Sequence, residues 1–401
     1  MSSENKKKYR RFLLWCAAFS LTAAVWLGYR YYDRKIPDEV QVAKGEDQNI
    51  RRLFDDPFLR FGEAVAVSAD GSCALPCSVM GVIPFKDVKI TPVERKNLMV
   101  SGSTVGIYLE TDGVLVVDTG EILCDSGDLL EPAKNIVQPG DYIVAFNEQK
   151  VTSKRQLMDD LSGLDSQKVT LRVQRNGEEI PLSVTPVKDT NGDYKLGLWV
   201  RDDTQGIGTL TYVDEKGGYG ALGHGIRDVD TGELLSIDEG DLYRAEILSI
   251  RKGGKGTPGE LAGLIRYEES NVIGSISGNT SNGIYGTLNP VDESISLKEM
   301  PIGYKQEMEI GPASILCSLG DGVQEYDAEI TKIDMNHEDT NKSFVIHITD
   351  EELLEKTGGI VQGMSGSPVL QDGKVVGAVT HVFVQDASTG YGIFIETMLE
   401  Q

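Results

Sequence analysis

The stretch "TGGIVQGMSGSPVLQDGK", residues 357–374, sets two serines in a turn of small residues, directly before a β-prone run. Gly363 and Gly366 permit a sharp turn at this point. A serine hydroxyl is a weak nucleophile unless a base lies beside it and backbone N–H groups face the future oxyanion. The stretch therefore predicts either a simple Ser/Gly turn between strands or a turn that presents one hydroxyl to a substrate.

The pattern G-x-S-G-x-P within this stretch is similar to the nucleophile turn of chymotrypsin-like serine peptidases, in which the middle serine attacks. On that match Ser365 is the nucleophile, and the N–H groups of Gly363 and Ser365 form the oxyanion hole. Ser367 falls where the trypsin pattern has glycine. A pattern this short leaves the simple turn open, so the other residues of the constellation have to decide.

The base for such a serine has to be a histidine, and the chain has four: His224, His337, His347 and His381. His224 lies on a glycine-flanked turn in "YGALGHGIRD", and we predict that it is the base. His381 lies on the strand after the nucleophile turn, which lines the substrate cleft in the chymotrypsin pattern, so we predict a cleft residue. The alternative for each is a satisfied structural histidine.

Two aspartates could orient the base. Asp228 lies four residues after His224, and its alternative role is a turn aspartate in "RDVDTG". Asp350 precedes Ser365 by fifteen residues, whereas the acid of the chymotrypsin order lies far upstream of the serine. Its alternative role is a helix cap before "EELLEK". The spacing alone leaves the acid open.

The 401-residue chain has a net charge of −23 that is unevenly distributed. Residues 1–35 hold eight basic and two acidic side chains and carry +6, which leaves −29 for the remainder. A body with this much negative charge repels the phosphate backbone of nucleic acids, so we expect no nucleic-acid partner. The length predicts two or three folded units, and the many short, glycine-broken β-prone runs predict a mainly β fold.

Residues 12–29, "FLLWCAAFSLTAAVWLGY", contain no charge and follow "KKKYRR". Eighteen residues are just enough to cross a bilayer as a helix, and the preceding basic residues would hold the N-terminus in the cytoplasm. A cleaved signal peptide is the alternative, but the run is long for one and "RYYDRK" offers no small-x-small cleavage site. We predict a single-pass anchor with an extracytoplasmic body; later removal of the anchor by another cut stays open.

The chain has five cysteines, of which Cys16 lies inside the predicted anchor. Cys73 and Cys77 form a C-x3-C pattern without a second ligand pair at metal spacing, so we expect neither a zinc site nor another cofactor. One disulfide among Cys73, Cys77, Cys124 and Cys317 is possible, but the sequence cannot assign it.

Residues 98–187 predict a small domain. A helix is expected after Ser153, which can cap it with Gln156 three residues on. Alternating apolar residues on both sides of Asn176-Gly177 predict a hairpin.

This order of strand, turn, "GDYIVAFN", helix and hairpin resembles a PDZ domain of the kind attached to bacterial proteases. A PDZ domain binds peptide ends by adding a strand to its sheet edge. The candidate peptide loop runs from Gly102 to Gly106. The alternative is a β-rich packing domain without a ligand.

Three stretches, "LGLWVRDDTQGIGTLTYV", "YGALGHGIRDVDTG" and "TGGIVQGMSGSPVLQDGKVVGAVTHVFVQDASTGYGIFIE", together with the anchor and the PDZ-like domain, resemble the stage IV sporulation protein B (SpoIVB) peptidase family. The resemblance runs from about Val79 to the C-terminus. It implies Ser365 as nucleophile, His224 as base and Asp350 as acid. One departure is Gly225, where we expect a β-branched residue.

The resemblance also implies a chymotrypsin-like β-barrel peptidase domain. The expected segments are residues 1–35 for tail and anchor, 36–97 for a stalk and lead-in, 98–187 for the PDZ-like domain and 188–401 for the peptidase. The implied role is in endospore formation, at the inner forespore membrane and facing the intermembrane space. There the peptidase cleaves itself and a regulator of an intramembrane metalloprotease, which releases pro-sigma-K processing.

Two other functions compete with this one. A PDZ-based adaptor with an inactive protease-like domain is disfavoured by the joint presence of Ser365, His224 and Asp350. A degradative protease of the HtrA kind is disfavoured because those enzymes place the PDZ domain after the protease.

Overall fold

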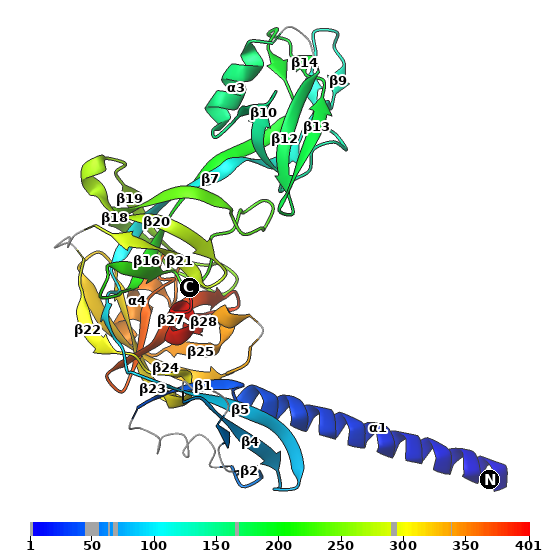
Figure 1. Cartoon of the computed structure of the whole chain (residues 1–401), viewed down its shortest axis with the longest axis vertical. Helices are drawn as coiled ribbons and strands as arrows, with labels where there is room; N and C mark the ends of the chain where they lie inside the picture. The colour runs from blue at the N-terminus through cyan, green and yellow to red at the C-terminus, as the bar shows by residue number, and fades with distance from the viewer. Residues whose placement is uncertain are drawn as a thin grey trace.

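The computed structural model describes residues 3–44, 56–62, 65–66, 71–164, 168–289, 295–337 and 339–401, with side chains from residue 8 onward. A single long helix, α1 (Ser3–Lys35), extends away from a body made almost entirely of strands (Figure 1). Among the described residues, α1 is the one helix long and apolar enough to cross a membrane, by length and composition.

The C-terminal end of α1 is fixed to the body by hydrogen bonds. The Asn336 side-chain amide donates to the carbonyls of Asp33, at 2.5 Å, and Ile36, at 2.6 Å. The Met335 N–H donates to the Arg34 carbonyl at 3.1 Å. These donors satisfy carbonyls that every helix end leaves without an intrahelical partner.

A five-stranded sheet follows where the sequence predicts a stalk. Its strands are β1 (Glu39–Ala43), β2 (Leu59–Phe61), β3 (Val65–Ala66), β4 (Cys73–Val79) and β5 (Ile83–Val93). Val40, Val88 and Ile36, which directly follows α1, share one core. This segment is therefore a folded unit of its own.

The next unit is a six-stranded β-barrel. The pairings of β7, β18, β20, β21, β17 and β16 form a ring, because β16 pairs back onto β7. Strands β6 and β22 continue the sheet from β16. The bounds are β6 (Asn97–Val100), β7 (Thr104–Thr119), β16 (Leu198–Val213), β17 (Gly218–Ala221), β18 (Ile237–Arg251), β19 (Glu260–Ile265), η1 (Glu269–Asn271), β20 (Val272–Thr280), β21 (Gly283–Leu288) and β22 (Lys298–Pro301).

The PDZ-like unit is inserted into this first barrel, through the far ends of β7 and β16 (Figure 1). Gly113, with φ of 97°, lies where β7 passes from the barrel into the insert. The elements between the two long strands are β8 (Ile122–Leu123), β9 (Leu129–Leu130), β10 (Tyr142–Phe146), β11 (Gln149–Lys150), α3 (Lys154–Ser162), β12 (Val169–Arg175), β13 (Glu178–Val184), β14 (Val187–Lys188) and β15 (Tyr194–Lys195).

The predicted details inside the insert are found in the structure. Ser153 accepts a hydrogen bond from the Gln156 N–H at 3.2 Å and caps α3. Asn176 and Gly177 have φ of 52° and 81° and join β12 to β13. The packing, however, divides the chain differently from the expected bounds. Residues 105–111 pair with β18 of the barrel, whereas Leu196 belongs to the core of the insert.

The C-terminal unit is a second closed barrel, in the order β23-β24-β25-β28-β27-β26. Its elements are η2 (Lys305–Glu307), β23 (Gly311–Ser318), β24 (Val323–Ile333), η3 (Thr340–Lys342), β25 (Phe344–Ile348), α4 (Glu351–Thr357), β26 (Pro368–Gln371), β27 (Lys374–Phe383), β28 (Asp386–Phe394) and α5 (Ile395–Met398). A shared core that includes Tyr212 of the first barrel and Ile393 of the second joins the two. Two packed six-stranded barrels are the expected chymotrypsin-like arrangement.

Candidate active site

The turn that holds Ser365 is built by two glycines and a threonine. Gly363 and Gly366 have φ of 102° and 95°, which side chains rarely adopt. Thr209, on β16, fixes the turn because its N–H donates to the Ser365 carbonyl at 3.0 Å and its hydroxyl donates to the Gly363 carbonyl at 2.8 Å. A Cβ on Gly366 would lie 2.1 Å from the Thr209 carbonyl oxygen. The first barrel therefore shapes the serine turn of the second.

The atoms around Ser365 are suited to a nucleophile at rest. Its hydroxyl donates to the Thr380 carbonyl at 2.8 Å. Within the described part of the chain, the N–H groups of Gly363 and Ser365 donate no hydrogen bond. Free, neighbouring N–H donors are what an oxyanion hole needs.

Two histidines lie together beside this turn. The ring centroids of His224 and His381 are 4.7 Å apart, with an angle of 36° between the ring planes. His224 Nδ1 lies 3.1 Å from the Gly225 carbonyl oxygen, which accepts a hydrogen bond from the Nδ1–H tautomer. In that tautomer Nε2 carries the free lone pair, so the imidazole can accept a proton there.

Burial keeps both imidazoles neutral. Desolvation, opposed by the Gly225 hydrogen bond and reinforced by the charge of Arg227, lowers the pKa of His224. Desolvation, and then the neighbouring His224, lower the pKa of His381 to about 4. A neutral imidazole is the form that acts as a base.

Ser365, His224 and His381 line one cavity of about 510 Å³. The walls come from both barrels, with Ile107 and Ile207 from the first and Ile360 and Val361 from the second. Arg227 lines the cavity, and no acidic side chain does so among the described residues. This is a largely apolar cleft that contains one serine and two histidines.

The two candidate acids lie elsewhere. Asp350 caps α4, where its carboxylate accepts from the N–H groups of Leu353, at 2.9 Å, and Asp327, at 3.4 Å. Asp228 accepts from the N–H groups of its own turn and pairs with Arg201. The orienting contact to His224 comes from a backbone carbonyl, and the acid role of Asp350 stays a prediction.

The other predicted residues do not join this site. His337 Nδ1 bonds within its own turn, and His347 Nδ1 lies 3.1 Å from the Thr389 hydroxyl. Gly102 packs against Leu316, where an added Cβ would lie 2.9 Å from its side chain and its carbonyl oxygen. Gly106 lies in the barrel part of β7, opposite Ile207.

A second cavity, of about 650 Å³, lies in the PDZ-like insert between α3 and residues 194–200. Leu157 and Met158 of α3 and Trp199 of β16 are among the residues that line it. The predicted peptide loop, Gly102 to Gly106, does not line this groove.

Sequence reasoning missed the residues that hold the turn from behind. Thr209 and Thr211 are buried, and the Thr211 hydroxyl donates to the Gly366 carbonyl at 2.7 Å. Two threonines alternating within the apolar run "GTLTYV" are the signal that could have identified them. Asn341 was also missed; its carbonyl accepts from the Thr380 hydroxyl at 2.6 Å at the edge of the cleft.

Gly225, the departure noted above, has a steric explanation. A Cβ at this position would lie 2.3 Å from the Thr280 carbonyl oxygen and from the Leu234 side chain. The backbone after His224 therefore packs too closely for any side chain.

Solved structures with similar parts include the PDZ domain of an SdrC-like protein from Listeria monocytogenes, at 18% identity, covering 22% of this chain and 87% of that chain, with a TM-score of 0.19. An HtrA-type protease solved with a decapeptide is 14% identical, with 50% of this chain and 51% of that chain covered and a TM-score of 0.30. The curated proteins contain no match.

The family model described as SpoIVB peptidase S55 matches residues 192–399, slightly more than half of the chain. The matched segment contains the serine turn, both histidines of the cleft and the whole second barrel. This chain belongs to the SpoIVB peptidase S55 family and is a serine peptidase.

Proposed function

We propose that the protein is a membrane-anchored serine endopeptidase that acts in sporulation signalling. Its proposed substrates are its own chain and a regulator of an intramembrane metalloprotease, so that cleavage triggers pro-sigma-K processing. The observation that carries the peptidase site is the placement of Ser365 beside His224 in one cleft, with two free N–H donors next to the serine.

In the proposed reaction, the Ser365 hydroxyl turns from the Thr380 carbonyl toward His224 when a peptide enters the cleft. Oγ attacks the scissile carbonyl carbon while its proton moves to His224 Nε2. The N–H groups of Gly363 and Ser365 stabilise the oxyanion. The C–N bond then breaks as His224 gives the proton to the leaving amine, and water hydrolyses the acyl-enzyme by the same route.

The Asp350 role as acid is proposed on the family resemblance. Asn caps a helix about as well as Asp, so Asp350→Asn should keep α4 intact while removing the charge. If Asp350 supports His224 in catalysis, kcat/KM should fall by roughly 10³ or more without a change in unfolding. Activity close to wild type would show that the carboxylate only caps α4 and that the Gly225 carbonyl suffices to orient the base.

The groove between α3 and β16 is the proposed site for a peptide or protein terminus. Its lining includes apolar Leu157 and Trp199 and charged side chains of both signs. Lys154 is paired with Asp202, and Lys195 lies within 4 Å of Asp189 and Asp193. A PDZ domain binds a peptide along a groove of this kind, beside a helix and a sheet edge, by adding the peptide as a strand. Such binding could direct a substrate to the cleft or restrain cleavage.

We propose that α1 crosses the membrane with its N-terminus in the cytoplasm and the body outside. On the family resemblance, we propose that this membrane is the inner forespore membrane and that the body faces the intermembrane space. Support for the orientation comes from the basic residues before the uncharged segment. Trp26, Tyr29 and Tyr31 near its far end suit a membrane–water interface there. The anchor would hold the cleft close to membrane-bound substrates.

The test is fluorophosphonate labelling and self-cleavage of the full chain in lipid nanodiscs. We expect wild type to show both, and His224→Ala to lose both while its unfolding is unchanged. His381→Ala, the matched control, removes the other imidazole and should weaken substrate binding more than labelling. A wild-type chain that is folded but shows neither reaction would favour the adaptor function.

A further inference from the structure

The turn that joins β4 to β5 is built from apolar residues that face solvent. Met80 is 65% exposed, Val82 is 81% and Ile83 is 60%. Met80 has φ of 55°, in the left-handed region where turns ordinarily place Asn, Asp or Gly. These side chains serve neither the turn geometry nor a core, and an apolar cluster of this kind points to a partner outside the chain.

The hairpin lies against the end of α1. The Phe85 ring on β5 has its centroid 5.3 Å from that of Tyr29 and 6.5 Å from that of Tyr32. Tyr29 is the last residue of the uncharged segment, so Phe85 lies level with the place where α1 would leave the hydrocarbon. Val82 is three residues nearer the tip, about 10 Å along the strand. Figure 1 shows the hairpin extending from the body on the same side as α1.

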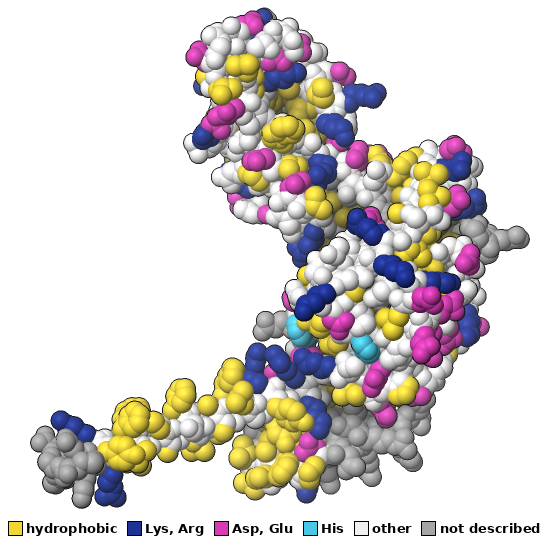
Figure 2. Space-filling view, turned by 180° about the vertical axis from the view of Figure 1, so that it is seen from behind, with side chains coloured by type: hydrophobic (Ala, Val, Ile, Leu, Met, Phe, Trp, Pro, Cys, Tyr) yellow, Lys and Arg dark blue, Asp and Glu magenta, His cyan; other side chains and the backbone are white. Residues whose placement is uncertain are grey.

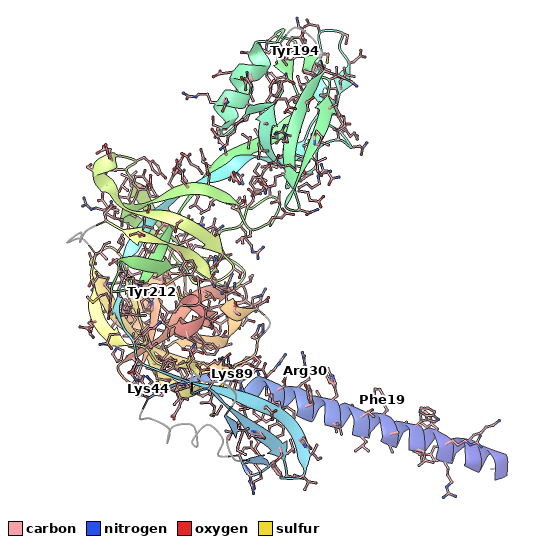
Figure 3. All side chains as sticks on the ribbon, in the orientation of Figure 1. Phe19, Arg30, Lys44, Lys89, Tyr194 and Tyr212 are labelled. Atoms are coloured by element: carbon pink, nitrogen blue, oxygen red, sulfur yellow. The ribbon has the colours of Figure 1, made fainter. Side chains whose placement is uncertain are left out.

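Basic side chains flank this apolar tip. Arg30 directly follows Tyr29, and the Arg60 side chain lies under the turn, 3.5 Å from where a Cβ on Gly81 would be. Figure 2 shows apolar side chains gathered beside the junction of helix and body, with Lys and Arg next to them. Figure 3 labels Arg30 near that junction and Phe19 farther along the helix. Apolar side chains and cations therefore lie next to each other where α1 meets the body.

We propose that the β4–β5 tip, Met80 to Ile83, is a second membrane contact that inserts into the interface of the bilayer crossed by α1. Apolar side chains beside cations are the composition of segments that lie in the headgroup region. The occupant is the phospholipid bilayer, because the tip is continuous with the membrane end of the anchor. One helix leaves a body free to rotate and tilt, whereas two contacts fix its orientation and the direction in which the cleft faces. The inference rests on the proposed anchoring of α1.

The experiment places one environment-sensitive thiol probe at a time on the full chain, in nanodiscs that each hold one copy. The three positions are native Cys16 in α1, Val82→Cys at the tip, and Val229→Cys as the matched control. Val229 is 85% exposed, a valine as accessible as Val82, on the loop after His224. Cys73→Ser is present throughout, and Cys16→Ser in the two variants that carry a new cysteine. The other three native cysteines are buried.

Spin-labelled lipid should quench the probes at positions 16 and 82 by roughly twofold or more, and leave the probe at position 229 unaffected. A quenched probe at 16 together with an unquenched probe at 82 overturns the tip contact and leaves the anchor intact. An unquenched probe at 16 instead refutes the anchor. A probe at 82 that is shielded from an aqueous quencher but untouched by spin-labelled lipid would mean that protein covers the tip, which also overturns the proposal.

Discussion

Replacing each serine of the turn by alanine separates the catalytic hydroxyl from its neighbour. Ser365 is half-buried and its hydroxyl donates one hydrogen bond, to the Thr380 carbonyl. Ser367 is fully buried, and its hydroxyl has no hydrogen-bond partner among the described residues. Ser365→Ala therefore loses one hydrogen bond, worth about 1 kcal/mol of unfolding free energy. Ser367→Ala removes an unsatisfied buried hydroxyl and should leave stability unchanged or raise it by up to about 1 kcal/mol.

For catalysis, we expect a large loss of activity in Ser365→Ala and little change in Ser367→Ala. Loss of the nucleophile should lower kcat by about 10⁶-fold, which is far more than 1 kcal/mol of stability can explain. Ser367→Ala should stay within a few-fold of wild type. The assays are fluorophosphonate labelling, self-cleavage and denaturant unfolding on the same preparations. Labelling that survives in Ser365→Ala but disappears in a folded Ser367→Ala would refute the assignment of the nucleophile.

Three further results are expected. Gly366→Ala should lower the free energy of unfolding by more than about 2 kcal/mol, because the new Cβ would collide with the Thr209 carbonyl. Gly373 also has a positive φ, of 73°, but nothing lies within 4 Å of its Cβ position, so Gly373→Ala should cost only about 1 kcal/mol. Denaturant unfolding measures both. The lowered pKa of His224 means that kcat/KM should rise with pH through a midpoint below 6.5 and be flat above it; a midpoint above 6.5 in the pH profile would contradict the buried base. Asn336→Ala removes the two hydrogen bonds that its amide donates at the end of α1 and a third that it accepts from the Asp38 N–H. Amide exchange at this end of α1 should therefore accelerate, and unchanged exchange would mean that other contacts hold the helix.

Local patterns predicted the elements whose cause is local. The hairpin of β12 and β13 pairs Val173 with Ile180 and Leu171 with Leu182, as the alternation on both sides of Asn176-Gly177 requires. Ser153 caps α3 because its hydroxyl reaches an N–H three residues away. Such features depend only on residues that are close in the sequence, so a single sequence is enough to predict them.

The insertion of the PDZ-like unit depends on distant partners instead. β7 contains sixteen residues that read as two β-runs, but its first half pairs with β18, about 130 residues later, and its second half with β10. Nothing in the strand itself identifies those partners, since a period of two fixes the faces of a strand and not its neighbours. The expected boundary at residue 98 therefore fell inside the first barrel. The same limit hid Thr209, whose hydrogen bonds reach a turn more than 150 residues away.

Asp350, the predicted acid, shows most clearly the difference between what local sequence predicts and what depends on distant residues. The position of Asp350 directly before "EELLEK" predicts a helix N-cap, and in the structure Asp350 is the N-cap of α4. A triad requires something that no local rule gives, namely a carboxylate aimed at an imidazole from another barrel. His224 lies on a turn of the first barrel, and its Nδ1 already faces a carbonyl from the next residue. A charge is not needed to fix that tautomer, but it would stabilise the imidazolium that forms during attack. Whether Asp350 supplies that charge is therefore a question about the transition state, and Asp350→Asn addresses it because the cap survives the change.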